Sequence, residues 1–359
     1  MTFPILQKHI ANELEENDAH NDLIEYIEEE AMDVVPHEKP LSPLPILHSP
    51  FIDVESIDQD QKQPDPRKAA LLAIDNELNN EDPMQTWPYA MDVFIYQKER
   101  EKDFIIGDYM VFRPHLNPWK RRLLIRWMVN VHQAFGTYRE SHFLSVKIVD
   151  LSLCRYAIDE DMLELLGAAA IKMASKFEAL QTVPANKLLK FCKRTYTATD
   201  LMEMEWSTMR RIGCDLGIPI GYRFLRRYAR TAVVPESTWT LASYILELAI
   251  FEYVTIGYSD SQMAAAALFI ALRMSNNPGQ LDGNTWNAML VYNSGYKLPD
   301  FARLVPVLNA VVHSQNCETV EAVRSLYSTP LLYEVAKVRS LSNEELFRDN
   351  PDLYNTIPS

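Results

Sequence analysis

Apolar residues recur at three- and four-residue steps along much of the chain, which is the spacing of amphipathic helices. One such series follows Asn117 and Pro118 and consists of Leu123, Leu124, Trp127, Met128, Val131 and Phe135. Asparagine caps helix N-termini well, and proline is tolerated at the first helical position because its missing N–H would be unpaired there anyway. The pattern therefore predicts a helix that begins at Pro118 and has a broad apolar face.

Two alanine-rich runs predict two central helices, each surrounded by other helices. Residues 167–174 lie in a predicted helix over about 159–177, and residues 264–271 repeat the pattern 97 positions later, after a capping residue at Ser259 or Asp260. Small side chains on several sides let other helices approach closely, so we interpret the runs as two copies of one helical unit. The alternative is that the alanines simply reflect high helix propensity.

The number of periodic segments predicts an all-α protein. About five helices fit into residues 116–216 and five into 219–316, and ten glycines among 359 residues with 47% apolar content are few for a sheet protein. Tyr89, Val93 and Tyr96 are spaced by four and three, which predicts one face of a further short helix ahead of these units.

The first part of the chain has a different composition. Residues 1–80 hold 18 acidic and 5 basic side chains, and prolines punctuate residues 36–66. Such a segment has too little apolar surface to order itself, so we expect residues 1–84 to be a disordered, acidic, proline-containing regulatory tail. A short helix over residues 23–32 that forms on binding is the alternative. Residues 81–359 have a net charge of −1, which disfavours a general nucleic-acid binder but not a local basic patch.

The side chains that carry enzyme chemistry are scattered. The four cysteines are 38, 22 and 103 residues apart, no histidines stand three or four apart, and no phosphate-binding loop or nucleophile elbow is present. We therefore expect no enzyme activity, metal or cofactor. We also expect a soluble chain without a secretory signal, since no apolar stretch reaches the roughly 18–20 residues that cross a bilayer.

Several motifs in order resemble those of the cyclin family. Residues 120–131 are similar to the M-R-A-I-L-V-D-W-L-V-E-V helix that opens the cyclin box, 174–178 to A-S-K-[FY]-E, 195–197 to T-Y-T and 204–205 to M-E. Residues 218–227 resemble the junction between the two boxes in the mitotic B-type class, particularly its third subclass. The resemblance covers roughly residues 85–320.

The resemblance implies a fold and a function. We expect a short N-terminal helix plus the first five-helix box over residues 85–217, the second box over 218–320, and a C-terminal extension over 321–359. The implied function is to bind and activate a mitotic cyclin-dependent protein kinase in the nucleus and cytoplasm, and so to control mitotic or meiotic progression. The alternative is a nucleic-acid-binding, transcription-factor-like use of the same fold, and an uncatalogued enzyme ranks third.

The resemblance also assigns residues to kinase binding. Lys176 and Glu205 match the charged pair that grips the mobile kinase helix, and Phe177 and Leu216 match apolar contacts near them. Cys214 replaces an aromatic residue of the family there. The implied kinase contacts also include Tyr89, Val93 and Tyr96, for which a purely intramolecular role is the alternative. Arg121 and Asp150 match a structural ion pair.

Substrate docking is where the sequence departs from the family. Leu123, Leu124 and Trp127 keep the apolar docking patch, but Lys120, Arg126 and Asn130 replace methionine, aspartate and glutamate. A basic rim would repel the arginine–x–leucine peptides that related cyclins bind, and could accept an acidic or phosphorylated segment instead. The alternative is an incidental group of solvated charges.

A degradation signal is suggested within the tail. The four residues Lys68, Leu71, Ile74 and Asn76 resemble the destruction box R-x-x-L-x-x-I-x-N with lysine in place of arginine. The resemblance implies a ubiquitin-ligase receptor as a second partner, although lysine weakens bidentate recognition. A helical segment without this function is the alternative.

Overall fold

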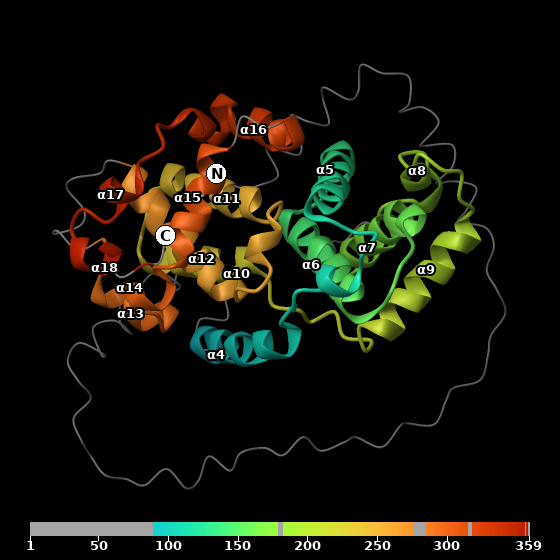
Figure 1. Ribbon diagram of the computed structural model, residues 1–359, viewed down its shortest axis with the longest axis horizontal. Helices are drawn as coiled ribbons and strands as arrows, with labels where there is room; N and C mark the ends of the chain where they lie inside the picture. Colours follow the sequence, from blue (N-terminus) through green and yellow to red (C-terminus); the bar gives the residue numbers. More distant parts are fainter. Residues whose placement is uncertain (1–88, 179–181, 276–284, 315–317, 356, 358–359) are drawn as a thin grey trace, which may run out of the picture. The chain divides into compact units, whose positions relative to one another are not determined.

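The computed structural model describes residues 89–178, 182–275, 285–314, 318–355 and 357, all within one compact unit, Ala73–Ser359. This described part is built from helices and contains no strand (Figure 1), so the all-α prediction is confirmed. The predicted tail and its destruction-box-like segment lie outside the described residues.

The first helical unit contains the five α-helices that the sequence predicts. They are α5 (Pro118–Ala134), α6 (Arg139–Arg155), α7 (Leu163–Glu178), α8 (Ala185–Leu189) and α9 (Ala198–Arg211), and the short 3₁₀ helix η6 (Glu160–Met162) precedes α7. The alanine-rich α7 contacts α5, α6, α8 and α9. It is therefore the central helix of this unit.

Local chemistry explains where these helices begin and how closely they pack. The Asn117 side chain accepts a hydrogen bond from the Lys120 backbone N–H at 2.8 Å, which caps α5 as predicted. At Gly167 of α7, a Cβ atom would lie only 2.9 Å from the Trp127 ring. The absence of a side chain there lets α5 and α7 approach each other closely.

The second unit repeats this arrangement around its own alanine-rich helix. It consists of α10 (Gly221–Thr231), α11 (Glu236–Ala249), α12 (Asp260–Met274), α13 (Ala288–Ser294), α14 (Leu298–Phe301) and α15 (Leu304–His313), with η7 (Tyr253–Thr255) after α11. α12 contacts α10, α11, α14 and α15, and Ser259 caps it. The described part thus has six α-helical segments here where five are predicted, because α13 ends at the left-handed Gly295 before α14 starts.

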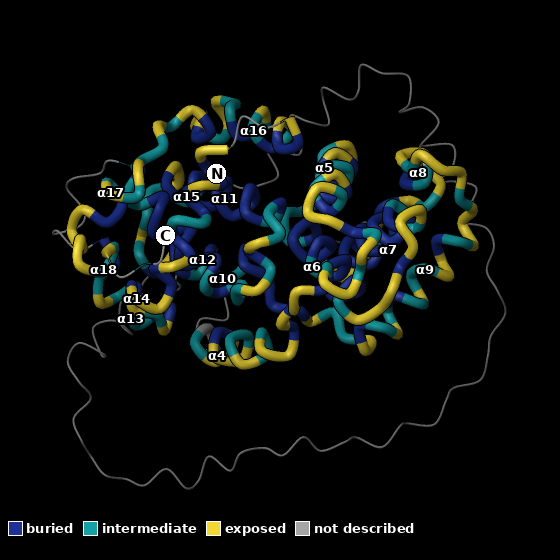
Figure 2. Tube along the Cα trace, viewed as in Figure 1, coloured by how far each residue is buried: buried dark blue, intermediate teal, exposed yellow. Residues whose placement is uncertain are grey.

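Shorter elements flank the two units. Ahead of them lie α4 (Ala90–Arg100), η4 (Glu101–Phe104) and η5 (Met110–Phe112), and after them η8 (Glu318–Val320), α16 (Glu321–Tyr327), η9 (Pro330–Leu332), η10 (Val335–Lys337), α17 (Asn343–Leu346) and α18 (Pro351–Asn355). α4 is attached to α10 by Phe94, whose ring packs edge-on against Phe224 and Tyr228 at 6.0 Å. Figure 2 shows α7 and α12 mostly buried, whereas α4 and α9 keep exposed faces.

Two buried histidines make stability depend on pH. His132 and His142 are each 5% exposed, and their rings lie 4.9 Å apart. Burial lowers the pKa of both rings below the usual value. His132 has hydroxyl partners in Thr137 and Ser145, whereas neither ring nitrogen of His142 has a partner in the described part of the chain.

We therefore expect stability to fall as the pH drops below about 6.5, because there the unfolded histidines bind protons that the folded ones do not. Between pH 7.5 and 5.5 the loss should be at most about 1 kcal/mol for each histidine, measured as the free energy of urea unfolding. His142→Phe should flatten this slope, whereas the control His313→Gln, at an exposed histidine, should not. Equal slopes for His142→Phe and wild type would contradict the assignment.

Candidate functional site

The charged pair that the resemblance singles out lies where α7 and α9 meet. Lys176 Nζ of α7 donates to Glu205 Oε2 of α9 at 2.6 Å, and Lys172 Nζ approaches Glu205 Oε1 at 3.4 Å. Glu205 is 13% exposed, whereas Lys176 is 47% exposed. The carboxylate is thus held between two lysines, and the Lys176 ammonium remains accessible to a partner.

An apolar pocket of about 500 Å³ adjoins this pair. Its lining includes both charged residues and Met173, Phe177, Trp206, Met209, Arg210, Cys214 and Leu216. Phe177 is 49% exposed and Trp206 is 67% exposed. Because large apolar side chains are rarely this exposed together, the pocket has the composition of a protein-binding surface.

The outer face of α4 presents further apolar side chains. Tyr89, Val93 and Tyr96 are 63%, 47% and 59% exposed, in contrast to the buried Phe94 of the same helix. These three side chains are largely exposed, although the Tyr96 ring also contacts Arg100. They remain available to a partner.

Arg100 joins α4 to the pocket. Its guanidinium donates to Asp215 at 2.5 Å and to the Gly217 carbonyl at 3.2 Å, and Nη1 lies 3.3 Å from the Tyr96 hydroxyl. The hydrogen bond from Arg100 lowers the pKa of Asp215. Since Leu216 stands between Asp215 and Gly217, Arg100 holds the C-terminal end of α4 beside the pocket residue Leu216.

Sequence reasoning missed Lys172, Trp206 and Arg100 in this site. Lys172 stands one helical turn before Lys176, and Trp206 follows Glu205 directly, so their positions next to the motifs were the available signal. Arg100 gave no such signal, because its partners beside the pocket, Asp215 and Gly217, lie more than 100 residues away in the chain.

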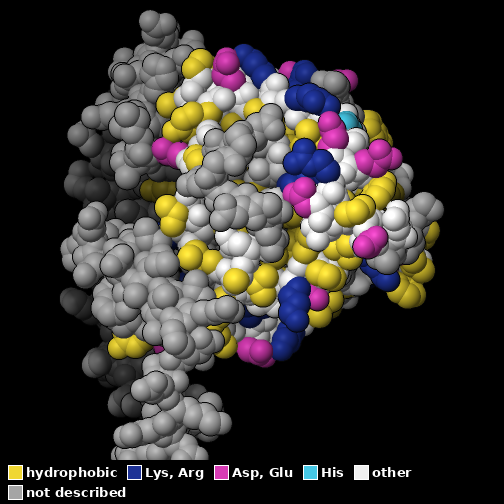
Figure 3. Space-filling view, turned by 90° about the vertical axis from the view of Figure 1, so that its left-hand side faces the viewer, with side chains coloured by type: hydrophobic (Ala, Val, Ile, Leu, Met, Phe, Trp, Pro, Cys, Tyr) yellow, Lys and Arg dark blue, Asp and Glu magenta, His cyan; other side chains and the backbone are white. Residues whose placement is uncertain are grey.

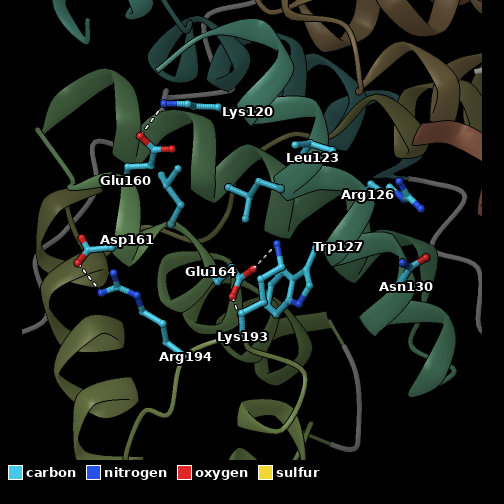
Figure 4. A pocket seen from close by; sticks show the side chains of 12 residues that line it. Lys120, Leu123, Arg126, Trp127, Asn130, Glu160, Asp161, Glu164, Lys193 and Arg194 are labelled. Atoms are coloured by element: carbon cyan, nitrogen blue, oxygen red, sulfur yellow. Dashed lines mark hydrogen bonds and ion pairs between the residues drawn. The ribbon is translucent and has the colours of Figure 1, made fainter. Parts of the chain in front are cut away.

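The predicted docking patch lines a second groove, of about 700 Å³. Its lining from α5 is Lys120, Leu123, Leu124, Arg126, Trp127 and Asn130, as Figure 4 shows. Leu123 is 39% exposed, but Leu124 is only 5% exposed and belongs mainly to the core. The accessible apolar floor is therefore smaller than the sequence pattern suggests.

The rim of this groove has mixed charge, so the expectation of a basic rim was incomplete. Three carboxylates from η6 and α7 face the bases across the groove (Figure 4): Glu160 pairs with Lys120 at 2.5 Å, Asp161 with Arg194 at 2.5 Å, and Glu164 with Lys193 at 3.6 Å. On the other side Arg126 approaches Glu318 at 3.2 Å. The lining carries four basic and three acidic side chains, close to neutrality.

Arg121 and Asp150 form a bidentate ion pair inside the protein. Arg121 donates to the two carboxylate oxygens at 2.7 and 2.6 Å, and both side chains are at most 5% exposed. Arg121 also donates to the Ile250 carbonyl at 2.9 Å, and the Tyr109 hydroxyl donates to Asp150 at 2.9 Å. The Asp150 charge raises the pKa of Arg121 despite its burial. The pair thus joins α5 and α6 to the end of α11, in a structural position.

Two further observations concern other classes of site. Among the described residues no group of three or more histidine, cysteine or acidic side chains is arranged to hold a metal ion. Within the same residues no helix combines the length and apolarity needed to cross a membrane.

The two helical units, each around an alanine-rich helix, correspond to known domain models. Residues 92–217 match the model "Cyclin, N-terminal domain", and residues 219–341 match "Cyclin, C-terminal domain". The chain belongs to the cyclin family.

Similar curated proteins narrow the class. The chain is 50% identical over 275 residues to a protein named G2/mitotic-specific cyclin-B3 from Drosophila melanogaster, covering 77% of this chain and 48% of that protein. Proteins of the same name from Gallus gallus and Homo sapiens are 36% and 35% identical, over 74% of this chain and over 64% and 19% of their own lengths. The chain thus spans about half of the Drosophila protein and less than two thirds of the other two.

Proposed function

We propose that the protein is the regulatory subunit of a mitotic cyclin-dependent protein kinase, which it binds and activates to control progression through mitosis or meiosis. The observation that carries the proposal is the Lys176–Glu205 pair at the rim of an exposed apolar pocket. Polar anchors beside large exposed apolar side chains are typical of interface hot spots. Names of the similar proteins, which describe G2/mitotic-specific cyclins, support the class of partner.

The proposed mechanism is a population shift. A protein kinase transfers phosphate only when its mobile helix turns inward and completes a lysine–glutamate ion pair. The pocket accepts the apolar face of that helix, while Lys176 and Glu205 bind its backbone and polar groups. The protein itself needs no catalytic residue, because a ligand that binds only the inward state increases the population of that state.

The direct test is to add the purified protein to monomeric cyclin-dependent kinases and to measure both complex formation and phosphorylation of a histone substrate. We expect a stable complex and an activity well above that of the kinase alone. A kinase that forms the complex but stays inactive would contradict the activating role, and a panel without any complex would contradict the proposal itself.

We further propose that the groove beside α5 docks substrates but binds arginine–x–leucine peptides weakly. Lys120 and Arg126 place two cations beside the peptide arginine, and their ion pairs with Glu160 and Glu318 offset only part of this charge. Surface pairs contribute roughly 0.2–1 kcal/mol each, so Lys120→Met with Arg126→Asp should tighten binding by about tenfold.

Fluorescence titration of a labelled peptide at low and high salt measures this effect. The gain from the double substitution should shrink at high salt, because salt screens surface charges. Lys102→Met is a matched control, since Lys102 is an exposed base of η4 that does not line the groove. Tight wild-type binding, or the same gain in the control, would contradict the prediction.

The nucleic-acid alternative has weaker support. The face in Figure 3 carries lysine and arginine side chains interspersed with acidic ones, rather than a basic stripe along an element. A protein that binds nucleic acid through many phosphates would gather basic side chains on its binding face.

Two finer proposals concern the cell. We propose that the protein occurs in the nucleus and cytoplasm, which imaging of a tagged chain would test. We also propose that a ubiquitin-ligase receptor recognises the segment with Lys68, Leu71, Ile74 and Asn76. Alanine at Leu71 should then lengthen the half-life of the protein in dividing cells, and an unchanged half-life would contradict this.

A further inference from the structure

Three arginines gather where α6 and α9 end. Arg113 donates from Nε to the Leu153 carbonyl at 3.3 Å, and Arg155 donates from Nη1 to the Arg211 carbonyl at 3.4 Å. The Arg211 guanidinium lies 5.0 Å from the centre of the Tyr156 ring. We call these residues, Arg113, Arg155, Tyr156 and Arg211, the arginine surface.

The positive charge of this surface is not neutralised by side chains. Within the described part of the chain no carboxylate lies at ion-pair distance from Arg113, Arg155 or Arg211, whereas Arg100 and Arg194 have such partners. The two helix C-termini together supply about one negative charge, since each end carries about half a charge. Three guanidinium groups therefore leave an excess of about two positive charges, which exceeds what a single carboxylate offsets.

A phosphoryl group has the complementary charge. On a side chain it carries about −1.5 to −2 at neutral pH and has three strong acceptor oxygens. Each guanidinium has five N–H donors, and the hydrogen bond from Arg155 to the Arg211 carbonyl uses only one of them. Tyr156 is 42% exposed, and its ring makes a cation–π contact with the Arg211 guanidinium, whose planar fork of N–H donors suits bidentate contacts with phosphate.

The position of the surface suggests where the phosphoryl group comes from. Arg210 lines the apolar pocket that we assign to the kinase helix, and Arg211 is the next residue of α9. A kinase seated in the pocket would thus bring its own surface to the arginines. We propose that the arginine surface binds a phosphorylated segment of the bound kinase, an inference that rests on the proposed function.

The first test compares the kinase in its phosphorylated and phosphatase-treated forms. The wild-type protein should bind the phosphorylated form about tenfold more tightly, and Arg155→Gln with Arg211→Gln should abolish this preference while it retains binding to the treated form. Lys187→Gln with Lys190→Gln is the matched control, since it removes two cations near α8 that also lack a carboxylate partner among the described residues. The control should keep the preference.

The second test needs no kinase. Inorganic phosphate, added against chloride at equal ionic strength, should perturb the arginine Nε–H NMR signals of the wild type and the control at millimolar concentration. The arginine double variant should require at least tenfold more phosphate. Retention of the wild-type response in that variant would overturn the assignment of the arginine surface as a phosphate site.

The outcomes separate this inference from the proposed function. If neither form of the kinase binds the wild type, the proposed function fails, and a phosphorylated kinase segment is excluded as the ligand of the arginine surface. The phosphate titration then still shows whether this surface binds a phosphate anion. If both forms bind the wild type equally, only the present proposal is overturned. Tighter binding of a short oligonucleotide than of the phosphorylated kinase would assign the surface to nucleic acid and would also overturn it.

Discussion

Replacement of Glu205 by alanine is expected to abolish kinase activation without unfolding the protein. Glu205 is the shared acceptor of Lys172 and Lys176, so its loss leaves two ammonium groups beside each other at the rim of the kinase pocket. Truncation of a central polar anchor costs about 2 kcal/mol or more of binding free energy, which corresponds to about 30-fold weaker binding.

The effect on folding should be small. Lys176 is 47% exposed and Glu205 is 13% exposed, and an ion pair with one partner in solvent contributes about 1 kcal/mol to stability. Lys176→Ala should therefore reduce kinase affinity much more than the unfolding free energy. Calorimetric titration with the kinase, a phosphorylation assay and urea unfolding measure the three quantities.

The matched control is Glu203→Ala, an exposed acid two residues earlier on α9 that does not line the pocket. It removes the same charge from the same helix, and it should leave affinity and activity close to wild type. Wild-type kinase activation by Glu205→Ala, or an equal loss in the control, would show that the pair is not the anchor.

Local signals made much of the fold predictable from the sequence. The capping residues Asn117 and Ser259 both stand where the helices begin, because a cap acts within one turn. The small residues of 167–174 and 264–271 indicated two central helices, and packing against neighbours on several sides confirms this interpretation. These features depend only on residues close together in the chain.

The charges of the docking groove could not be predicted in the same way. Glu160, Asp161 and Glu164 reach the groove because η6 and α7 pack against α5, and the periodicity of one helix does not reveal the charges on another. Leu124 shows the same limit, since it follows Leu123 in the apolar series yet lies in the core. Which apolar residue of a broad face stays accessible is decided by the helix that packs on it.

Substitution of Arg121 by methionine is expected to have the largest effect on stability. Methionine keeps much of the arginine side-chain volume, but it leaves the buried Asp150 carboxylate with the Tyr109 hydroxyl as its remaining hydrogen-bond partner among the described side chains. It also removes the hydrogen bond to the Ile250 carbonyl. Removal of one member of a buried pair costs about 3–5 kcal/mol, because the other charge remains without compensation.

A double-mutant cycle, measured as the free energy of urea unfolding, separates the pair from its surroundings. Asp150→Leu alone should also be strongly destabilising, since it strands the buried guanidinium. Arg121→Met combined with Asp150→Leu should recover a large part of the loss, because apolar replacement of both partners leaves no uncompensated charge. Arg194→Met, which breaks the exposed pair with Asp161, is the control and should change stability by less than about 1 kcal/mol.

Additive losses in the double variant would contradict an ion pair as the source of the effect. A small loss for Arg121→Met alone would mean that solvent reaches Asp150.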